Sequence, residues 1–428
     1  MRPRAIVPLV SEPKTRPLRL TRGRLVGVIA GAIVLTVGTM AWWLWGDHTA
    51  FRLLTESPFA GRCNKEVTRA AVVRSLELGT RFMLVHQKRA GNFDYEYDWR
   101  AKEYTDDDNE VRQAGALWGL ALLYQDRPTS ELGAAVEKGL AYFDKHSVRT
   151  PSGARCVAYP GKASPGIGTV ALIALTYIEY LGAAQELPEG RRAFHQSRLS
   201  EYLAMLAASV NPDGLWFGNY DPATCVASGA PSPYSDGEAL LTLVKAARYA
   251  GHPELLPLIM RTAEAGHRLN VVEALDKDAD SDTTKGYYQW SSMAFYELAS
   301  SDWPDTAPYG EYLLELADWQ IDVHKTLTRQ RNTGYAYEGI IPAYDYASKK
   351  RDPRAAKLAC VIDLGLGRLL SWQVGGPLAS SYTRGVSPDE RLAVGGVQNE
   401  AREPALRIDV TQHQMHALIF AKNLVYKR

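Results

Sequence analysis

Apolar residues recur with the 3.6-residue period of α-helices in twelve consecutive segments, and these segments alternate between two compositions. Odd-numbered segments are charged and amphipathic, as in NKEVTRAAVVRSLELGTRF, whereas even-numbered segments are apolar and rich in small residues, as in GTVALIALTYIEYLGA. A helix that is apolar most of the way round is normally buried. We therefore expect the even segments to form an inner ring and the odd segments an outer ring.

The expected helices fill the chain after residue 63, with almost no strand-like pattern between them. The odd segments are 64–87, 130–147, 190–210, 254–275, 309–329 and 353–372, and the even segments are 109–125, 167–184, 236–250, 288–300, 337–350 and 411–427. Even-to-odd links are short and contain Pro or Gly, as in QDRPTS, while odd-to-even links are mostly long and aromatic, as in GNFDYEYDWRAKEYTDDD. Long loops in compact domains are usually functional. A site is therefore expected at the face where the long loops gather, which we call the mouth.

Six helical hairpins with one elaborate face are the plan of the (α/α)6 toroid. On this plan the chain from Asn64 to Arg428 resembles the six-hairpin superfamily of carbohydrate-active proteins. The resemblance implies an all-α toroid and a carbohydrate ligand. Because this kind of fold hosts hydrolases, lyases and epimerases, it does not by itself define the reaction.

The N-terminal region predicts a membrane anchor. Residues 1–24 carry seven Lys or Arg and one Glu, residues 25–45 contain no charge, and residues 46–63 form a linker to the toroid at 64–428. Twenty-one apolar positions can cross a bilayer, and the preceding charges keep the N-terminus cytoplasmic. We expect a single-pass protein of a bacterial inner membrane with a periplasmic or extracellular main domain; a cleaved signal peptide is the alternative. The remainder of the chain is mildly acidic, which argues against a nucleic-acid partner.

The four cysteines would then face an oxidising space. Cys156 and Cys225 fall in equivalent loops, so either a disulfide between them or two free buried thiols is expected. The sequence contains no C-x-x-C and no H-x-x-x-H pairing, so a dedicated zinc site is not expected, and no cofactor is predicted.

The N-termini of the inner helices should meet at the mouth, where their free N–H groups favour anionic ligands. In the first mouth loop, Asp108 is a candidate catalytic acid, and Arg112, on the first turn of the helix that follows, is a candidate ligand-binding residue. Helix capping by Asp108 explains much of this cluster. Asp236 and Glu238 repeat the acidic pattern at the third inner helix, and there we favour capping.

Aromatic residues recur in the mouth segments, where they could stack on sugar rings or pack the loops down. The candidates for ligand stacking are Tyr95, Tyr97, Trp216, Tyr288, Trp290 and Tyr335. Among the acids, Glu338 with Asp409 or Glu400 is best placed to pair across the mouth. Hydrolysis of a glycosidic bond needs two carboxyl groups roughly 5 Å apart for retention or roughly 6.5–9.5 Å apart for inversion.

The motif Arg407-x-Asp409-x-Thr411-x-His413 resembles, with a one-residue offset, a C-terminal segment of the D-glucuronyl C5-epimerases. The resemblance implies that Arg407 binds a carboxylate, while His413 and Tyr337 exchange the proton at C5. His413 could instead be a structural residue.

Together these features predict a glycoside hydrolase-like protein acting on an envelope or exported polysaccharide that contains acidic sugars. A uronyl C5-epimerase or polysaccharide lyase is one alternative. A non-catalytic protein for glycan binding or polysaccharide assembly is another.

Overall fold

A computed structural model describes residue 63, residues 66–387 and residues 390–427. The chain divides into two compact units, Met1–Leu54 and Thr55–Arg428, and every described residue belongs to the second. The predicted basic tail and anchor, with all but the last residue of the linker, lie outside the described residues. Within the described part, no helix has the length and apolarity that crossing a bilayer requires.

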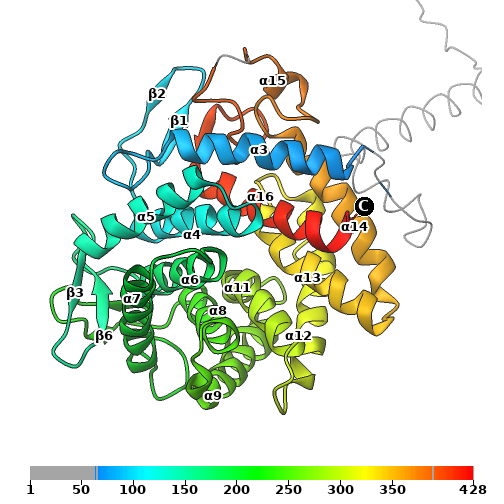
Figure 1. The fold of residues 1–428 in the computed structure, drawn as a ribbon. Coiled ribbons are helices and arrows are strands. Elements are labelled where there is room, and N and C mark those ends of the chain that lie inside the picture. The colour runs from blue at the N-terminus through cyan, green and yellow to red at the C-terminus, as the bar shows by residue number, and fades with distance from the viewer. Residues whose placement is uncertain (1–62, 64–65, 388–389, 428) are drawn as a thin grey trace, which may run out of the picture. The chain divides into compact units, whose positions relative to one another are not determined.

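Six helices form a closed inner ring in the second unit (Figure 1). They are α4 (Glu110–Asp126), α6 (Ile167–Ala183), α8 (Pro233–Tyr249), α11 (Asp282–Ala299), α13 (Gly334–Lys350) and α16 (Ile408–Phe420). Each packs against the next in this order, and α16 packs against α4 to close the ring. The predicted inner set is therefore confirmed.

A second set of helices surrounds this ring, each joined to an inner helix as the outer half of a hairpin. These are α3 (Arg69–Val85), α5 (Ser130–Lys145), α7 (Glu189–Ala208), α9 (Leu256–His267), α12 (Ala307–Asp318) and α14 (Arg354–Ser371). Burial separates the two sets as their compositions predict: the first fourteen residues of α6 are all buried, whereas only six of the twenty residues of α7 are. The alternation of apolar and amphipathic segments thus produces the two concentric layers.

Short helical turns extend or precede several of these helices. A 3-10 turn, η1 (Pro253–Leu255), precedes α9, which continues through the π-helical turn η2 (Arg268–Val272) into α10 (Glu273–Lys277). A π-helical turn, η3 (Trp319–Val323), extends α12 and is followed by the 3-10 turn η4 (Thr326–Thr328), and η5 (Ala421–Val425) extends α16. The four-residue helix α15 (Ser381–Arg384) lies in the long last link.

Seven short strands lie in the links that precede inner helices. They are β1 (Glu96–Asp98), β2 (Glu103–Tyr104), β3 (Ser147–Arg149), β4 (Arg155–Val157), β5 (Asn219–Tyr220), β6 (Ala227–Ser228) and β7 (Ala405–Arg407). Antiparallel pairing gives the sheets β2-β1-β7, β3-β4 and β5-β6. Glu96 pairs with Arg407 in the first sheet, so the first mouth loop is held against the residue that precedes α16.

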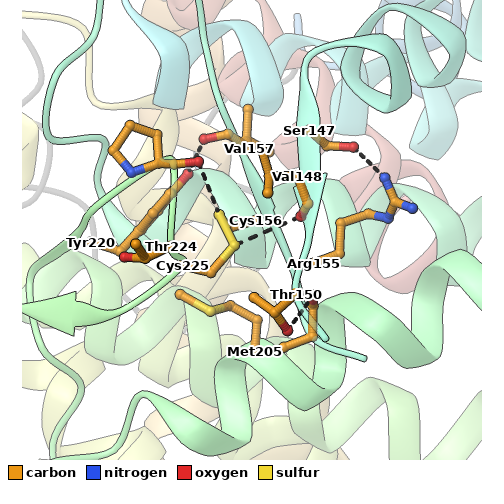
Figure 2. Close-up of a disulfide and its surroundings, with 12 residues drawn as sticks. Ser147, Val148, Thr150, Arg155, Cys156, Val157, Met205, Tyr220, Thr224 and Cys225 are labelled. Atoms are coloured by element: carbon orange, nitrogen blue, oxygen red, sulfur yellow. Dashed lines mark hydrogen bonds between the residues drawn. A yellow bond between two sulfur atoms is a disulfide. The ribbon is translucent and has the colours of Figure 1, made fainter. Parts of the chain in front are cut away.

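Two disulfides join segments that are distant in sequence. Cys156 in β4 is bonded to Cys225 in the β5–β6 loop, which confirms the first of the two sequence expectations (Figure 2). Beside this bond, the Tyr220 hydroxyl donates a hydrogen bond to the Val157 carbonyl at 2.8 Å. The second disulfide joins Cys63, which precedes the first outer helix in sequence, to Cys360 in the last outer helix, and it was not predicted from the sequence.

Four inner helices, α8, α11, α13 and α16, begin earlier than the sequence pattern predicts. The N-cap of α11 is Ser281, whose hydroxyl accepts from the Thr283 amide, and α13 begins at Gly334. Tyr335 therefore lies on a helix rather than in a mouth loop, and Tyr288 and Trp290 lie further inside α11 than predicted. In the same way, α16 begins at Ile408, so Asp409 lies in its first turn.

Candidate active site

Two adjoining cavities open among the N-terminal ends of the six inner helices. The first, of about 410 Å³, is lined by residues that include Glu238 and Trp290, and the second, of about 570 Å³, by residues that include Tyr335. Three side chains line both cavities: Arg112, Asp409 and His413. These three residues mark the place where the cavities meet, and the chemistry of the site is built around them.

The imidazole ring of His413 is positioned by the buried carboxylate of Glu338. His413 lies one helical turn after Asp409 on α16, and its Nδ1 atom is 3.2 Å from Oε1 of Glu338 on α13. Nδ1 of His416 lies at the same distance from that oxygen, and Gln289 donates a hydrogen bond to the other carboxylate oxygen. Glu338 has no exposed surface and lines neither cavity, and His416 lines neither cavity, so His413 is the ionisable member of this group that can reach a ligand. The Gln289 side chain also lines the first cavity.

The electrostatics of this group favour an ion pair. Burial acts to raise the pKa of Glu338, but the charges of His413 and His416 outweigh it and hold that pKa below its ordinary value. Burial acts to lower the pKa of His413, and the Glu338 carboxylate outweighs it and raises that pKa. Since Nδ1 is engaged by Glu338, Nε2 is the ring nitrogen of His413 available for proton transfer.

Asp409 is clamped by two guanidinium groups. Arg407 Nε and Nη2 lie 3.0 and 2.6 Å from its two oxygens, and Arg112 Nε lies 3.4 Å from Oδ2. The Tyr95 hydroxyl accepts from Arg112 Nη1 at 2.5 Å and donates to Asp409 at 3.4 Å. Burial acts to raise the pKa of Asp409, but the arginines lower it overall. The cluster therefore presents an ionised carboxylate with an excess of one positive charge.

Glu238 is the site residue that the sequence analysis assigned to capping. It is 4% exposed on α8 and lines the first cavity, and among the described residues none donates a hydrogen bond to its carboxyl group. Burial raises the pKa of Glu238 to about 8, so the group holds a proton at neutral pH. Its neighbour Asp236 instead accepts from the Trp216 amide at 2.8 Å and from Asn270 at 2.9 Å, which is a structural role.

The predicted acids Asp108 and Glu400 are not brought into the cavities. Asp108 is exposed and accepts hydrogen bonds from Gln113 and from the Tyr159 hydroxyl, at 2.9 and 2.7 Å. It does not cap α4 either, because the N-cap is Asn109. Glu400 pairs with Arg331 at 2.8 Å, and it lines neither cavity.

The predicted aromatic residues divide into two groups. Trp290 and Tyr335 line the cavities, and Tyr95 contacts the Asp409 cluster through its hydroxyl. The other predicted aromatic residues, Tyr97, Trp216, Tyr288 and Tyr337, are at most 2% exposed and line neither cavity.

Internal contacts explain why these four aromatic side chains do not line the cavities. The Trp216 indole donates to the Leu206 carbonyl at 2.9 Å, and the Tyr288 hydroxyl donates to the Ala336 carbonyl at 3.0 Å. Tyr97 packs among aromatic rings of the first mouth loop, and Tyr337 packs against Gly365 on α14. The structure therefore does not bring Tyr337 to His413 as a proton-transfer partner at a ligand.

Sequence reasoning also missed Tyr234, which is 50% exposed and lines the first cavity. Its position just inside α8, after Pro233, was the available signal, because Pro is common in the first turn of a helix. As for metals, the described part of the chain contains no cluster of three or more His, Cys, Asp or Glu side chains that could hold an ion.

No family model matches the sequence, and no curated protein matches it. The structure is similar to that of the GH76 α-mannanase BT2949 of Bacteroides thetaiotaomicron, with a TM-score of 0.55, 10% identity and coverage of 83% of this chain and 96% of that one. It is also similar to a D-mannose isomerase, with a TM-score of 0.57, 12% identity and coverage of 82% and 96%. An unsaturated glucuronyl hydrolase specific for heparin gives a TM-score of 0.54, 11% identity and coverage of 83% and 98%.

At these identities the likeness shows a shared fold. The described part of the chain is an (α/α)6 toroid of six helical hairpins, as the pattern of helices predicts. The enzymes named above are proteins that this chain is similar to in structure, and the reaction has to be argued from its own side chains.

Proposed function

We propose that this chain is a carbohydrate-active enzyme that binds an anionic sugar in the toroid mouth and transfers a proton through His413, as an epimerase or a lyase does. The proposal depends on the place where the two cavities meet. There His413, whose Nδ1 contacts Glu338, lines both cavities together with Asp409. Asp409 in turn forms ion pairs with Arg112 and Arg407. A base beside a carboxylate-binding cluster is the combination that proton abstraction from a uronate requires.

In the proposed mechanism, Arg407 and Arg112 neutralise the carboxylate of a uronic acid residue. His413 is a base only in its neutral form, which it reaches by losing its proton to solvent above its raised pKa. Neutral His413 then removes the proton from the adjacent carbon: the C–H bond breaks, an N–H bond forms, and the electron pair moves onto the carboxylate. Glu338 stabilises the imidazolium that results. Return of a proton to the opposite face of the carbon gives epimerisation, whereas departure of the group on the neighbouring carbon gives elimination.

Hydrolysis is the second candidate, and a different observation favours it. Glu238 and Asp409 line the same cavity, and their environments separate their pKa values, with the first raised to about 8 and the second lowered. Glu238 would protonate the leaving oxygen and Asp409 would activate water or attack the sugar. We rank this second because both oxygens of Asp409 already accept from guanidinium groups, which makes it a weak base.

The similar structures include two proteins named as sugar hydrolases and one named as a sugar isomerase, which supports a carbohydrate ligand. We also propose that residues 25–45 anchor the protein in an inner membrane and that the toroid acts outside the cytoplasm on an envelope or exported polysaccharide. Two disulfides support this location, because such bonds persist mainly in oxidising compartments.

Isotope incorporation would test the proposal. The full-length protein in detergent is incubated with uronate-containing and neutral oligosaccharides in D2O and, separately, in water enriched in oxygen-18. Carbon-bound deuterium or an unsaturated product that appears with the uronate substrates supports proton transfer through His413, and the oxygen isotope at a new reducing end supports hydrolysis. His413→Asn should abolish turnover, while the control His252→Asn, in the link after α8, should not. Binding with no product from any substrate would leave a non-catalytic glycan-binding protein.

A further inference from the structure

The second cavity is lined by an unusual number of cations. Its positively charged side chains are Arg112, Lys285, Arg329, Arg331 and Arg407. Within the described residues, Asp409 is the single acidic side chain in the lining. The cations come from α4, α11, the segment between η4 and α13, and the residue before α16, so sequence proximity alone does not explain their convergence.

Arg331 and Lys285 have N–H groups that form no hydrogen bond with the described residues. Arg331 Nε donates to Glu400 at 2.8 Å, but among the described residues there is no acceptor for its two terminal nitrogens, and its side chain is 76% exposed. The closest ion-pair oxygen to Lys285 belongs to Asp282 at 3.9 Å, which is beyond hydrogen-bond range. Arg331 and Lys285 can therefore bind a ligand without giving up a strong internal contact.

The backbone holds Arg331 in place. Residues Arg331 and Glu400 form an isolated antiparallel bridge, and the adjacent Asn332 amide donates to the Asn399 carbonyl at 2.6 Å. The cavity wall next to these residues contains the Asn399 side chain and the Tyr335 ring. An amide for hydroxyl groups and an aromatic ring for a sugar face are features of a carbohydrate subsite.

We propose that the second cavity is a subsite for an acidic sugar residue next to the reacting one, so that the substrate is an oligomer with repeated anionic groups. This inference rests on the proposed function, since the reacting residue is the one placed at His413. Arg331 and Lys285 bind the carboxylate or sulfate ester of the neighbouring residue. They determine selectivity for polymer over monomer, and the guanidinium fork of Arg331 matches the oxygens of either group.

Equilibrium binding to the full-length protein tests this subsite. The probes are a uronate tetrasaccharide, its carboxyl-reduced neutral counterpart, a sulfated neutral tetrasaccharide and the uronate monosaccharide. We expect at least one anionic tetrasaccharide to bind more tightly than the neutral one, and the stronger of the two identifies the anionic group. Arg331→Gln should reduce the preference for that tetrasaccharide over the monosaccharide about tenfold, the loss expected for one charge-assisted hydrogen bond. The control Arg127→Gln removes an equally exposed arginine that lines neither cavity and should change nothing.

The experiments can contradict the proposed subsite and the proposed reaction independently of each other. Equal binding of all the tetrasaccharides, or an Arg331→Gln protein that keeps its full preference, overturns the subsite even if His413→Asn abolishes turnover. Conversely, a preference for anionic oligomers that Arg331→Gln removes supports the subsite, even if no isotope enters any product. A folded state shown by unchanged thermal unfolding is required of both variants.

Discussion

Nδ1 of His413 lies 3.2 Å from Oε1 of Glu338, and of these two side chains only the histidine lines the cavities. A carboxylate with no access to a ligand therefore controls the protonation of a histidine that has such access. His416 shares the same carboxylate oxygen at 3.2 Å but lines neither cavity. The arrangement separates the group that sets the charge from the group that carries out the chemistry.

Replacing Glu338 should lower the pKa of His413. In Glu338→Gln the neutral amide no longer stabilises the imidazolium, so the pKa of His413 should fall from its raised value to below the ordinary 6.5, because burial remains. The acidic limb of the rate profile, which reports deprotonation of the base, should move to lower pH. NMR titration of the His413 ring measures the same shift directly. An unchanged pKa in this variant would show that Glu338 does not control His413.

The same ion pair should make stability depend on pH in two directions. The lowered pKa of Glu338 contributes stability above its unfolded value of 4.5 that is lost as pH falls through the folded pKa. The raised pKa of His413 contributes stability below its unfolded value of 6.5 that is lost as pH rises through the folded pKa. Glu338→Gln should therefore be destabilised most between pH 4.5 and 6.5, the two unfolded pKa values, by about 3 kcal/mol. Denaturant unfolding at several pH values checks this; a constant difference at every pH would contradict it.

Asp409→Asn separates positioning from direct catalysis. If Asp409 serves to orient Arg407 and Arg112, as their contacts indicate, the variant should bind substrate less well, with KM raised about tenfold and kcat changed much less. If Asp409 is instead the base or nucleophile of a hydrolase, kcat should fall by about a thousandfold or more at similar KM. Steady-state kinetics on the same oligosaccharide distinguish these outcomes, and the second would favour the hydrolase.

The fold was predictable because its signal is repeated. Segments such as 167–184 are apolar most of the way round, which predicts helices that are buried on all sides. Alternation with amphipathic segments then predicts an inner ring covered by an outer layer of helices. The boundaries were less predictable, because polar residues begin the inner helices: the sequence pattern started α11 at Tyr288, six residues after its first residue, Asp282.

The site was predicted in part. His413, Asp409, Arg407 and Arg112 were identified from charge in the last mouth segments, where the structure gathers them. Glu238 was assigned to capping because its burial and lack of partners depend on the packing of α6 against α8. Four of the aromatic predictions, Tyr97, Trp216, Tyr288 and Tyr337, were misplaced for a similar reason. Tyr337 and Gly365, on neighbouring helices, fit together in a way that no local pattern encodes.

Gly168 should be required for the position of Glu238. A Cβ atom built at Gly168 on α6 would lie 1.9 Å from Glu238 Oε2, so Gly168→Ala must displace that carboxyl group from its place in the first cavity. We expect a loss of about 2 kcal/mol in the free energy of unfolding and weaker ligand binding. Gly182→Ala on the same helix is the matched control, because nothing lies within 4 Å of its Cβ, and it should be neutral or slightly stabilising. Equal behaviour of the two variants in urea unfolding would count against the packing described.

Both disulfides should contribute to stability in the mature protein. Alkylation of the unfolded, unreduced protein should find none of the four cysteines free. Replacing Cys156 and Cys225 together by Ser should lower the free energy of unfolding by about 4 kcal/mol, because the bond closes a loop between residues 69 apart in sequence. Thermal unfolding with and without reductant provides the comparison: the reductant should destabilise the parent protein more than the double variant. Recovery of free thiols from the oxidised protein would contradict the prediction.

The proposed export of the toroid can be tested without knowing its substrate. Reporters fused after residue 60 should be active as alkaline phosphatase, which needs an oxidising compartment to form its disulfides, and inactive as a fluorescent protein that folds only in the cytoplasm. The physical reason is the apolar span at 25–45 with its excess of arginine on the N-terminal side. As a control, exchanging the arginines at positions 16, 19, 22 and 24 for glutamate reverses that excess, since it leaves three basic and five acidic side chains in residues 1–24, and it should reduce the phosphatase signal. A cytoplasmic reporter at residue 60 in the parent protein would contradict both the anchor and the compartment in which the disulfides are expected to form.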